Sequence, residues 1–188
     1  IFMVIKLNYL QEKPPPGGMY SATKYNQMYS KTSVHKDPLN IGQEFQDFIV
    51  EQASKELGIT ISIFQSKKYQ YAKGESLQGV EIKYDARSTG DRTYYDCIAT
   101  NNVAIEIAEK TNSNNANYCP SGIYRNDNSW LYIVGNYDCA WIFAKTTLIL
   151  LHKSPSAQYK INTMPTLISM LLPIKHADKY CAKKLTFK

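Results

Sequence analysis

The sequence predicts a single α/β domain with a central mixed β-sheet flanked by helices. One long amphipathic helical pattern precedes several short runs that are typical of strands, and two of those runs are continuously apolar, as in the middle of a sheet. The chain has 188 residues, of which 44% are hydrophobic, enough for one substantial core. We expect an N-terminal extension at residues 1–36, a core at 37–152 and a helical, basic segment at 153–188.

The clearest helical pattern covers residues 41–57. Asn40 suits the N-cap position, and Gly58 suits the position directly after the helix. Apolar residues recur at steps of three and four and so predict one buried stripe, formed by Ile41, Phe45, Phe48, Ile49, Ala53 and Leu57.

Two strand patterns follow the helix. Residues 59–64 alternate between apolar and polar side chains and predict the first core strand. The second pattern covers residues 80–85, between Gly79 and a Ser-Thr-Gly turn. Because successive side chains of a strand point to opposite faces, one face is apolar and the other carries the charged residues Glu81, Lys83 and Asp85.

Residues 102–108 predict a strand beside the charged one. Two later runs, 130–134 and 140–143, meet around a Gly-Asn turn and are apolar enough to form the buried middle of the sheet. Residues 145–152 predict a helix, or a strand that turns into one. In the C-terminal segment an apolar helical face, used for core closure or for a dimer contact, is predicted by Leu167, Met170 and Leu171.

Two neighbouring strands that carry carboxylates offer a site for a hard metal ion. Mg²⁺ prefers oxygen ligands, keeps several waters and is usually held by one or two carboxylates together with substrate phosphate oxygens. Glu81 and Glu106 supply such carboxylates, and Asp85 is a further candidate ligand. Lys83 lies on the same strand face, where its charge either stabilises the transition state or helps to orient and deprotonate the attacking water.

At these residues the chain resembles the PD-(D/E)xK nuclease superfamily, which includes many restriction endonucleases, resolvases and phage nucleases. The resemblance covers residues 40–148 and depends on Glu81-Ile82-Lys83, which matches the Glu-x-Lys motif of the family. It implies a restriction-endonuclease-like fold, a Mg²⁺ cofactor that Mn²⁺ can replace, and DNA as the substrate. Many members of the family cut duplexes as dimers, so the resemblance also makes a homodimer plausible.

The motif fits this chain in two registers. In the first, Glu81 and Lys83 belong to the Glu-x-Lys strand, and the preceding carboxylate is Glu75, which lies in a turn-like Lys-Gly-Glu-Ser sequence. In the second, Glu81 is the first metal carboxylate, Glu106 is the second, and the lysine is Lys83 or Lys110. We favour the second register because both carboxylates then lie within strands.

The resembling nucleases often carry a helical Glu that contacts a second metal ion or a metal-bound water. Glu44 and Glu51 lie seven residues apart at the edge of the buried stripe, so either takes this role by resemblance, with Asp47 slightly further round. The alternative is that all three are ordinary solvent-facing helix charges.

The basic balance of the chain agrees with a polyanionic partner, since its net charge is +6 and its pI is about 9.0. Arg87 and Arg92 follow the charged strand, and their guanidinium forks suit phosphates and guanine edges. The alternative is that they pair with Asp91 or Asp96. Lys110 and Arg125 complete the predicted nucleic-acid contacts. The tyrosine-rich residues 20–33 either stack on bases or form a helix that covers the core.

Cysteine spacing and hydropathy indicate the compartment. The four cysteines form no Cys-x-x-Cys pair and the three histidines are scattered, which argues against zinc and predicts free thiols. No run of eighteen apolar residues and no secretory pattern is seen, so we expect a cytoplasmic protein of bacterial or phage type that makes no membrane contact.

The sequence therefore predicts a metal-dependent endonuclease that hydrolyses DNA phosphodiester bonds. One alternative is a catalytically inactive nucleic-acid-binding module on the same fold, and another is an unrelated α/β interaction protein whose acidic rows face solvent. The first two hypotheses separate on whether the Glu81 and Glu106 carboxylates converge.

Overall fold

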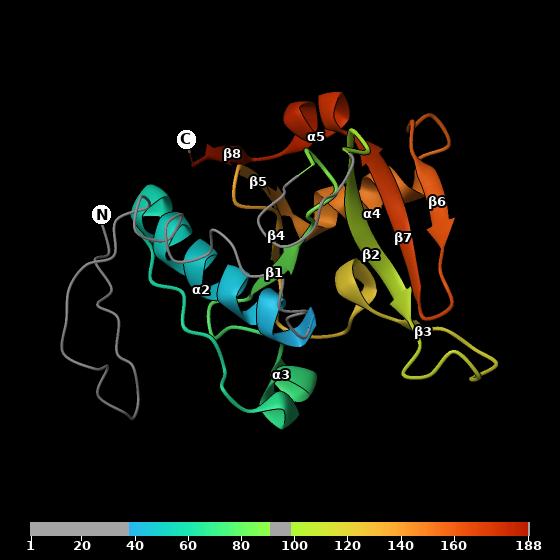
Figure 1. The fold of residues 1–188 in the computed structure, drawn as a ribbon, viewed down its shortest axis with the longest axis horizontal. Helices are drawn as coiled ribbons and strands as arrows, with labels where there is room; N and C mark the ends of the chain where they lie inside the picture. Colours follow the sequence, from blue (N-terminus) through green and yellow to red (C-terminus); the bar gives the residue numbers. More distant parts are fainter. Residues whose placement is uncertain (1–37, 91–98, 188) are drawn as a thin grey trace, which may run out of the picture.

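The computed structural model describes residues 38–90 and 99–187. Over these residues the chain forms one long helix, α2, followed by shorter helices and strands (Figure 1). In chain order the elements are α2 (Pro38–Leu57), α3 (Lys67–Lys73), β1 (Val80–Tyr84), β2 (Asn102–Glu109), β3 (Cys119–Pro120), the 3₁₀ helix η1 (Gly122–Tyr124), β4 (Leu131–Gly135), β5 (Cys139–Ala144), α4 (Lys145–Lys153), β6 (Lys160–Thr163), β7 (Leu167–Pro173), α5 (Ile174–Tyr180) and β8 (Lys183–Thr186).

The strands form two four-stranded sheets, in the orders β1-β4-β5-β8 and β3-β2-β7-β6. Only β1 and β4 pair in parallel, and the other strand pairs are antiparallel. The expected α/β class is confirmed, but the expected single central sheet is wrong. β2 is not the neighbour of β1, because β2 pairs with β7 in the second sheet.

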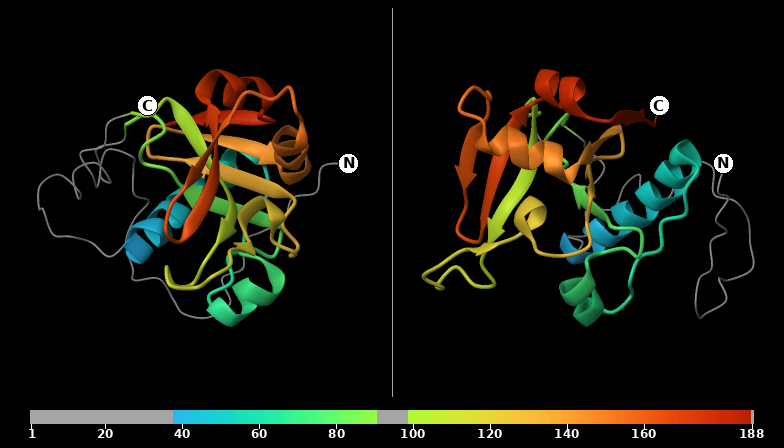
Figure 2. Two further views of the ribbon diagram at one scale, coloured as in Figure 1. Left: turned by 90° about the vertical axis from the view of Figure 1, so that its right-hand side faces the viewer. Right: turned by 180° about the vertical axis from the view of Figure 1, so that it is seen from behind.

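The elements are arranged in layers. Helix α2 packs on one face of the β1-β4-β5-β8 sheet, and the second sheet packs on the opposite face of that sheet (Figure 1). The two further views show β2, β7 and β6 together at one side of the molecule and α2 at the other (Figure 2). Strands β4 and β5 are the inner strands of their sheet, as their continuous apolar sequences predicted.

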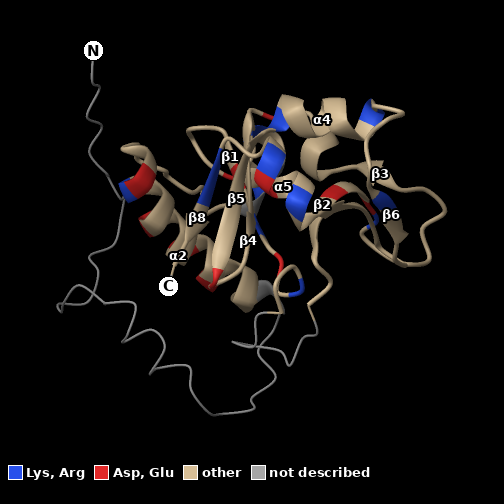
Figure 3. Cartoon of the chain, turned by 90° about the horizontal axis from the view of Figure 1, so that it is seen from above, with Lys and Arg blue, Asp and Glu red and all other residues tan. Residues whose placement is uncertain are grey.

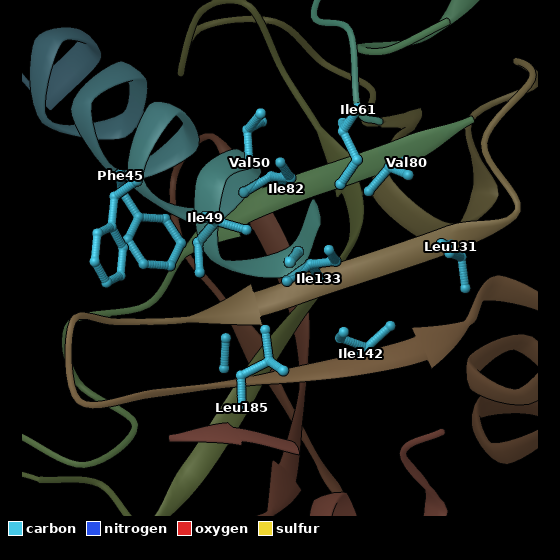
Figure 4. Close-up of a cluster of buried hydrophobic side chains, with 13 residues drawn as sticks. Phe45, Ile49, Val50, Ile61, Val80, Ile82, Leu131, Ile133, Ile142 and Leu185 are labelled. Atoms are coloured by element: carbon cyan, nitrogen blue, oxygen red, sulfur yellow. The ribbon is translucent and has the colours of Figure 1, made fainter. Parts of the chain in front are cut away.

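The first core lies between α2 and the first sheet (Figure 4). Phe45 and Ile49 of the helix are fully buried and pack with Val80 and Ile82 of β1 and with Ile133 of β4. The predicted apolar stripe is therefore confirmed. The helix begins at Pro38, three residues before the expected start, so Asn40 lies inside it and is not the N-cap. It ends at Leu57, where Gly58 takes the positive φ of 64° that glycine adopts readily.

The second core lies between the two sheets. Because side chains alternate along β4, its Tyr132 and Val134 face away from α2 and pack with Val103 and Ile105 of β2 and with Met170 of β7. Strand β4 thus contributes to both cores. Helices α4 and α5 also pack here through Leu148 and Ala177, and the predicted helix after β5 is confirmed as α4.

Two sequence-based element predictions were wrong. Residues 59–64 form no regular strand, and their pairing is limited to a single bridge between Ile63 and Ser76, although Ile61 still packs in the first core. Leu167, Met170 and Leu171 lie in strand β7, not on a helical face. A short apolar run fits a buried strand and a buried helix equally well, so its pattern alone does not separate them.

Among the described residues, no helix is long and apolar enough to cross a membrane. Three of the cysteines are free thiols, namely Cys119, Cys139 and Cys181. Cys97, the predicted extension at residues 1–36 and Arg92 lie outside the described residues.

Candidate functional site

Three glutamates gather around the ammonium group of Lys83. Its Nζ atom lies 3.3 Å from Oε1 of Glu75, 3.1 Å from Oε1 of Glu81 and 3.5 Å from Oε2 of Glu106. The three acids come from the loop before β1, from β1 and from β2. We call these four residues the acidic cluster. Its side chains are largely buried, with exposed fractions of 14% for Glu75, 0% for Glu81, 15% for Glu106 and 23% for Lys83.

The alternation of β1 places Glu81 and Lys83 between the two sheets. Val80 and Ile82 point into the first core, beneath α2, so the intervening residues point the other way. In the parallel pairing with β4, Glu81 is the partner of Tyr132, which itself packs in the second core. The predicted division of β1 into an apolar and a charged face is confirmed, but the charged face is interior.

Glu75 reaches the cluster because β1 is an edge strand. Among the described residues, the backbone of β1 has no strand partner on the side away from β4. On that side the Ile82 amide donates a hydrogen bond of 3.0 Å to Oε2 of Glu75. The same oxygen accepts a hydrogen bond of 3.4 Å from Nε2 of Gln46 on α2. The loop before β1 is thereby fixed to both the strand and the helix.

Two features of the backbone direct Glu106 toward the cluster. The pairing of β2 with β7 is irregular between Glu106 and Ala108, and such bulges turn side chains away from the regular strand direction. Gly122 of η1 lies against this point, with a φ of 51°, and a Cβ atom there would lie only 2.7 Å from Cβ of Glu106. The Glu106 amide also donates a hydrogen bond of 3.3 Å to the Tyr132 hydroxyl.

Burial and charge shift the pKa values in opposite directions within the cluster. Burial raises the pKa of Glu81 and outweighs the attraction of Lys83. Burial alone would also raise the pKa of Glu106, but Lys83, Ser121 and Arg125 outweigh it and hold the pKa below its usual value. Burial disfavours the charged form of Lys83, yet the three carboxylates raise the pKa of its ammonium well above the usual value. Lys83 is therefore a fixed positive charge in this arrangement and not a proton acceptor.

The carboxylate oxygens that face away from Lys83 suit a hard cation. Oε2 of Glu81 and Oε1 of Glu106 are buried and make no hydrogen bond of good geometry among the described residues, although Ser121 lies near enough to Glu106 to lower its pKa. Buried carboxylate oxygens normally have donors or a bound ion, and Oδ2 of Asp127 is in the same state, but Asp127 already pairs with Lys145. Within the described part of the chain, no three His, Cys, Asp or Glu side chains are positioned to hold a metal ion. Mg²⁺ commonly uses only one or two protein carboxylates, with water and phosphate as its other ligands, and the Glu81 and Glu106 pair fits that requirement.

Asp85, the third predicted metal ligand, already accepts hydrogen bonds from backbone amides. Its Oδ2 accepts a hydrogen bond of 2.8 Å from the Ala104 amide, and its Oδ1 accepts one of 3.1 Å from the Arg87 amide. These bonds connect the end of β1 to the start of β2. Asp85 thus holds the two acidic strands together across the two sheets.

The predicted helical acids differ in their surroundings. Glu51 is exposed and pairs with Lys55 of the same helix at 2.6 Å. Glu44 is half-buried, and its charge contributes to the raised pKa of Asp47, of which burial is the larger cause. Gln46 of α2 contacts Glu75 of the cluster, and no sequence pattern had pointed to Gln46.

Of the predicted nucleic-acid contacts, Arg125 lies nearest to the acidic cluster. Arg125 follows η1, and its guanidinium contacts Glu109 at 3.6 Å. Burial alone would lower the pKa of Arg125, but the nearby Glu81 and Glu106 outweigh burial and raise it. Lys110 lies over the ring of Tyr118 at 4.2 Å, and Arg87 is exposed at the end of the β1 segment.

The structure brings together the carboxylates of both sequence registers. Glu75 belonged to the register that we disfavoured because it lies in a turn, yet the turn itself carries it to Lys83. Tyr132 and Ser121 were also missed, since one resembles any core aromatic and the other any loop serine. Both residues lie close to the glutamates in the folded chain, but their distance along the sequence does not reveal this.

No protein-family model matches the chain, and no curated protein or solved structure matches it either.

Proposed function

We propose that the protein is a Mg²⁺-dependent endonuclease that hydrolyses DNA phosphodiester bonds, similar in its site to the PD-(D/E)xK nucleases. The observation that carries the proposal is the convergence of Glu81 and Glu106, from strands of different sheets, on Lys83, with one buried oxygen of each acid lacking a hydrogen bond. Carboxylates and a lysine in one buried group are the parts that metal-assisted phosphodiester hydrolysis requires.

Each residue has a distinct part in the proposal. Glu81 and Glu106 would hold the metal ion, with Mn²⁺ as an alternative to Mg²⁺, and a bound ion would activate water and polarise the phosphate. Lys83 supplies a permanent positive charge beside the phosphate. Glu75 holds the Lys83 ammonium in place through its 3.3 Å contact. Arg125, next to the same acids, would bind a phosphate oxygen.

The overall charge supports a DNA substrate. The net charge of +6 favours a polyanion, and basic residues are distributed over α4, α5 and β8 (Figure 3). Glu75, Glu81 and Glu106 are largely buried, at the position where a metal ion would neutralise them.

A second function is an inactive nucleic-acid-binding module. Its support is the same Lys83, which already forms ion pairs with all three carboxylates. In that case the cluster would only hold the two sheets together.

The test is cleavage of supercoiled and linear DNA with Mg²⁺ or Mn²⁺ by the purified protein and by three variants, Glu81→Gln, Glu106→Gln and Lys83→Met. Glu56→Gln is the matched control, because Glu56 is an exposed acid paired with Lys183 at 2.9 Å, remote from the cluster. We expect metal-dependent cleavage in the parent and the control, and a loss of at least a hundredfold in each variant.

The outcomes separate the two functions. DNA that is bound but never cut with any divalent ion would establish the inactive module. Cleavage that survives both Glu81→Gln and Glu106→Gln would disprove the assigned site, even if the protein were a nuclease.

A further inference from the structure

One of the two tryptophans is held on the surface beside the loop that carries Glu75. Trp130 is 59% exposed, whereas Trp141 is fully buried. The Trp130 indole Nε1 donates a hydrogen bond of 2.8 Å to the Gln78 carbonyl, and its backbone amide donates one of 2.8 Å to the Gly79 carbonyl. A Cβ atom at Gly79 would lie 2.6 Å from Cδ1 of the ring. The ring is therefore fixed by its pyrrole edge, and the rest of it faces solvent.

Further hydrogen bonds join the segment before β1 to the segment before β4. The Asn128 amide donates to the Lys73 carbonyl at 3.4 Å, and the Asn128 side chain donates to the Ser76 carbonyl at 3.0 Å. Leu77, which lies next in sequence to Ser76, is 64% exposed. Lys73, Leu77 and Trp130 are each exposed and lie on segments that are hydrogen-bonded to one another, and we call these three residues the Trp130 surface.

The charges of the Trp130 surface suit a polyanion. Lys73 is exposed, and so is Lys68 on the same short helix, where Tyr69 adds a second aromatic ring that is 58% exposed. The acids nearest in sequence, Glu75 and Asp127, are turned inward to Lys83 and Lys145. Exposed aromatic rings between lysines are the arrangement with which proteins bind single-stranded nucleic acid, because the rings stack on bases and the ammonium groups bind phosphates.

The Trp130 surface is also connected directly to the acidic cluster. Glu75 lies in the same loop as Leu77. Trp130 precedes Leu131, which pairs with Val80, the residue before Glu81. The Trp130 surface is therefore attached to the segments that carry Glu75 and Glu81, whose side chains are turned into the interior toward Lys83.

We propose that the Trp130 surface binds an unpaired nucleobase of the DNA substrate by stacking on the indole ring, with Lys73 on the adjacent phosphate. The proposal depends on the proposed function for the identity of the ligand class. It adds a preference for single-stranded or frayed DNA next to the site of cleavage, which the acidic cluster alone does not specify.

The test measures binding of labelled single-stranded and duplex oligonucleotides by anisotropy, in EDTA so that no cleavage occurs. Trp130→Leu removes the aromatic face, Trp130→Phe keeps one, and Lys73→Gln removes the charge. Lys160→Gln and Leu150→Ser are matched controls, since Lys160 is exposed on β6 and Leu150 is 70% exposed on α4. Thermal unfolding of each variant checks that the protein is folded.

We expect Trp130→Leu to weaken binding of the single strand by about tenfold, Trp130→Phe to weaken it less, and both controls to bind as the parent does. Intrinsic fluorescence gives a second reading without relying on Trp130→Leu. DNA should quench the parent protein, and the signal of Trp130→Phe, which comes from the buried Trp141, should stay constant.

Three results would overturn the inference. They are a Trp130→Leu variant that binds as tightly as the parent, fluorescence that does not change at saturating DNA, and self-association through Trp130 in the absence of DNA. Its failure is distinguishable from that of the proposed function. Cleavage that needs Glu81 and Glu106 but not Trp130 leaves the nuclease without this surface, and stacking without cleavage leaves the surface without the nuclease.

Discussion

At the scale of single residues, Lys83 determines whether three buried carboxylates can be tolerated between the sheets. Its ammonium is the positive group within 3.5 Å of all of them, and it also holds them near one another. A buried charge that loses its partner costs far more than an exposed one, because water does not replace the lost interaction. The same residue is thus required for the fold and, in the proposed function, for the chemistry.

We predict that Lys83→Met destabilises the protein by about 3 kcal/mol at pH 8 and by much less at pH 5. Burial raises the pKa of Glu81 even with Lys83 present, and removing Lys83 removes the attraction that opposes this shift. The loss of stability should therefore grow as the pH rises through the range in which Glu81 ionises, and fade as Glu81 protonates below that range. Urea unfolding at the two pH values, in EDTA, measures the difference. The control Lys55→Met, which removes an exposed pair with Glu51, should change stability by less than about 0.5 kcal/mol at either pH. An equal loss at both pH values for Lys83→Met would contradict the assigned network.

Gly122 positions Glu106 because it combines a positive φ with a close approach. Its φ is 51°, and a Cβ atom would meet the backbone and Cβ of Glu106. Either feature alone favours glycine, and together they require it. Gly58 has a similar φ of 64° but nothing within 4 Å, so it shows the cost of the backbone conformation by itself.

We predict that Gly122→Ala costs about 3 kcal/mol and removes DNA cleavage, whereas Gly58→Ala costs about 1 kcal/mol and leaves cleavage unchanged. The alanine at position 122 must push η1 away from β2 and so displace Glu106. Chemical denaturation and the cleavage assay measure the two effects. Wild-type cleavage by a folded Gly122→Ala variant would show that Glu106 does not depend on this contact.

At the scale of elements, the start of α4 is fixed by a buried ion pair. Lys145 and Asp127 lie 3.0 Å apart, with side-chain exposed fractions of 7% and 1%. Lys145 also donates to the Arg125 carbonyl at 3.0 Å, so the pair connects α4 to the loop that presents Arg125 to the acidic cluster. Burial would raise the pKa of Asp127, but the Ser129 amide and Lys145 outweigh it and hold the pKa below its ordinary value of 3.8.

We predict that Asp127→Asn lowers stability by about 2 kcal/mol at pH 7. An acid whose folded pKa is depressed contributes stability above its unfolded pKa and loses it as the pH falls through the folded value. The difference between the parent and Asp127→Asn should therefore shrink below pH 3.8 and be absent once the folded carboxyl is protonated. Unfolding curves at pH 7 and through the acid range test this, and a constant difference would show that the carboxylate charge is not involved.

At the scale of the whole molecule, local pattern predicted the elements better than their partners. The α2 stripe and strands β1, β4 and β5 followed from periodicity, because each buries a face defined by its own sequence. Strand pairing depends on distant segments, and the sequence of β2 does not reveal that β7 is its neighbour.

The candidate site shows the same limit. Glu81, Lys83 and Glu106 were predicted, whereas Glu75 and Gln46 were not selected, since their positions depend on how a loop and a helix pack.

The C-terminal residues are integral to both sheets, although we expected them to be a separate helical and basic segment. β7 lies between β2 and β6 in the second sheet, and β8 pairs with β5 at the edge of the first. Met170 and Leu172 of β7 and Leu185 of β8 are buried in the two cores. Removing these strands exposes the apolar face of β2, and Glu106 loses the pairing that holds its strand.

We predict that a chain ending at residue 153 does not fold, because the second core then lacks Met170 and Leu172 of β7 and β2 loses its pairing partner. Far-UV circular dichroism and cooperative thermal unfolding would show the loss. The matched comparison is a chain that ends at residue 182, which lacks only β8 and keeps the β2–β7 pairing. That chain should stay folded but lose stability, since Leu185 is 3% exposed and its removal uncovers one end of the first core. If the chain ending at 153 unfolded cooperatively and kept DNA cleavage, the N-terminal part would be an independent domain and β2 would not need β7 to place Glu106.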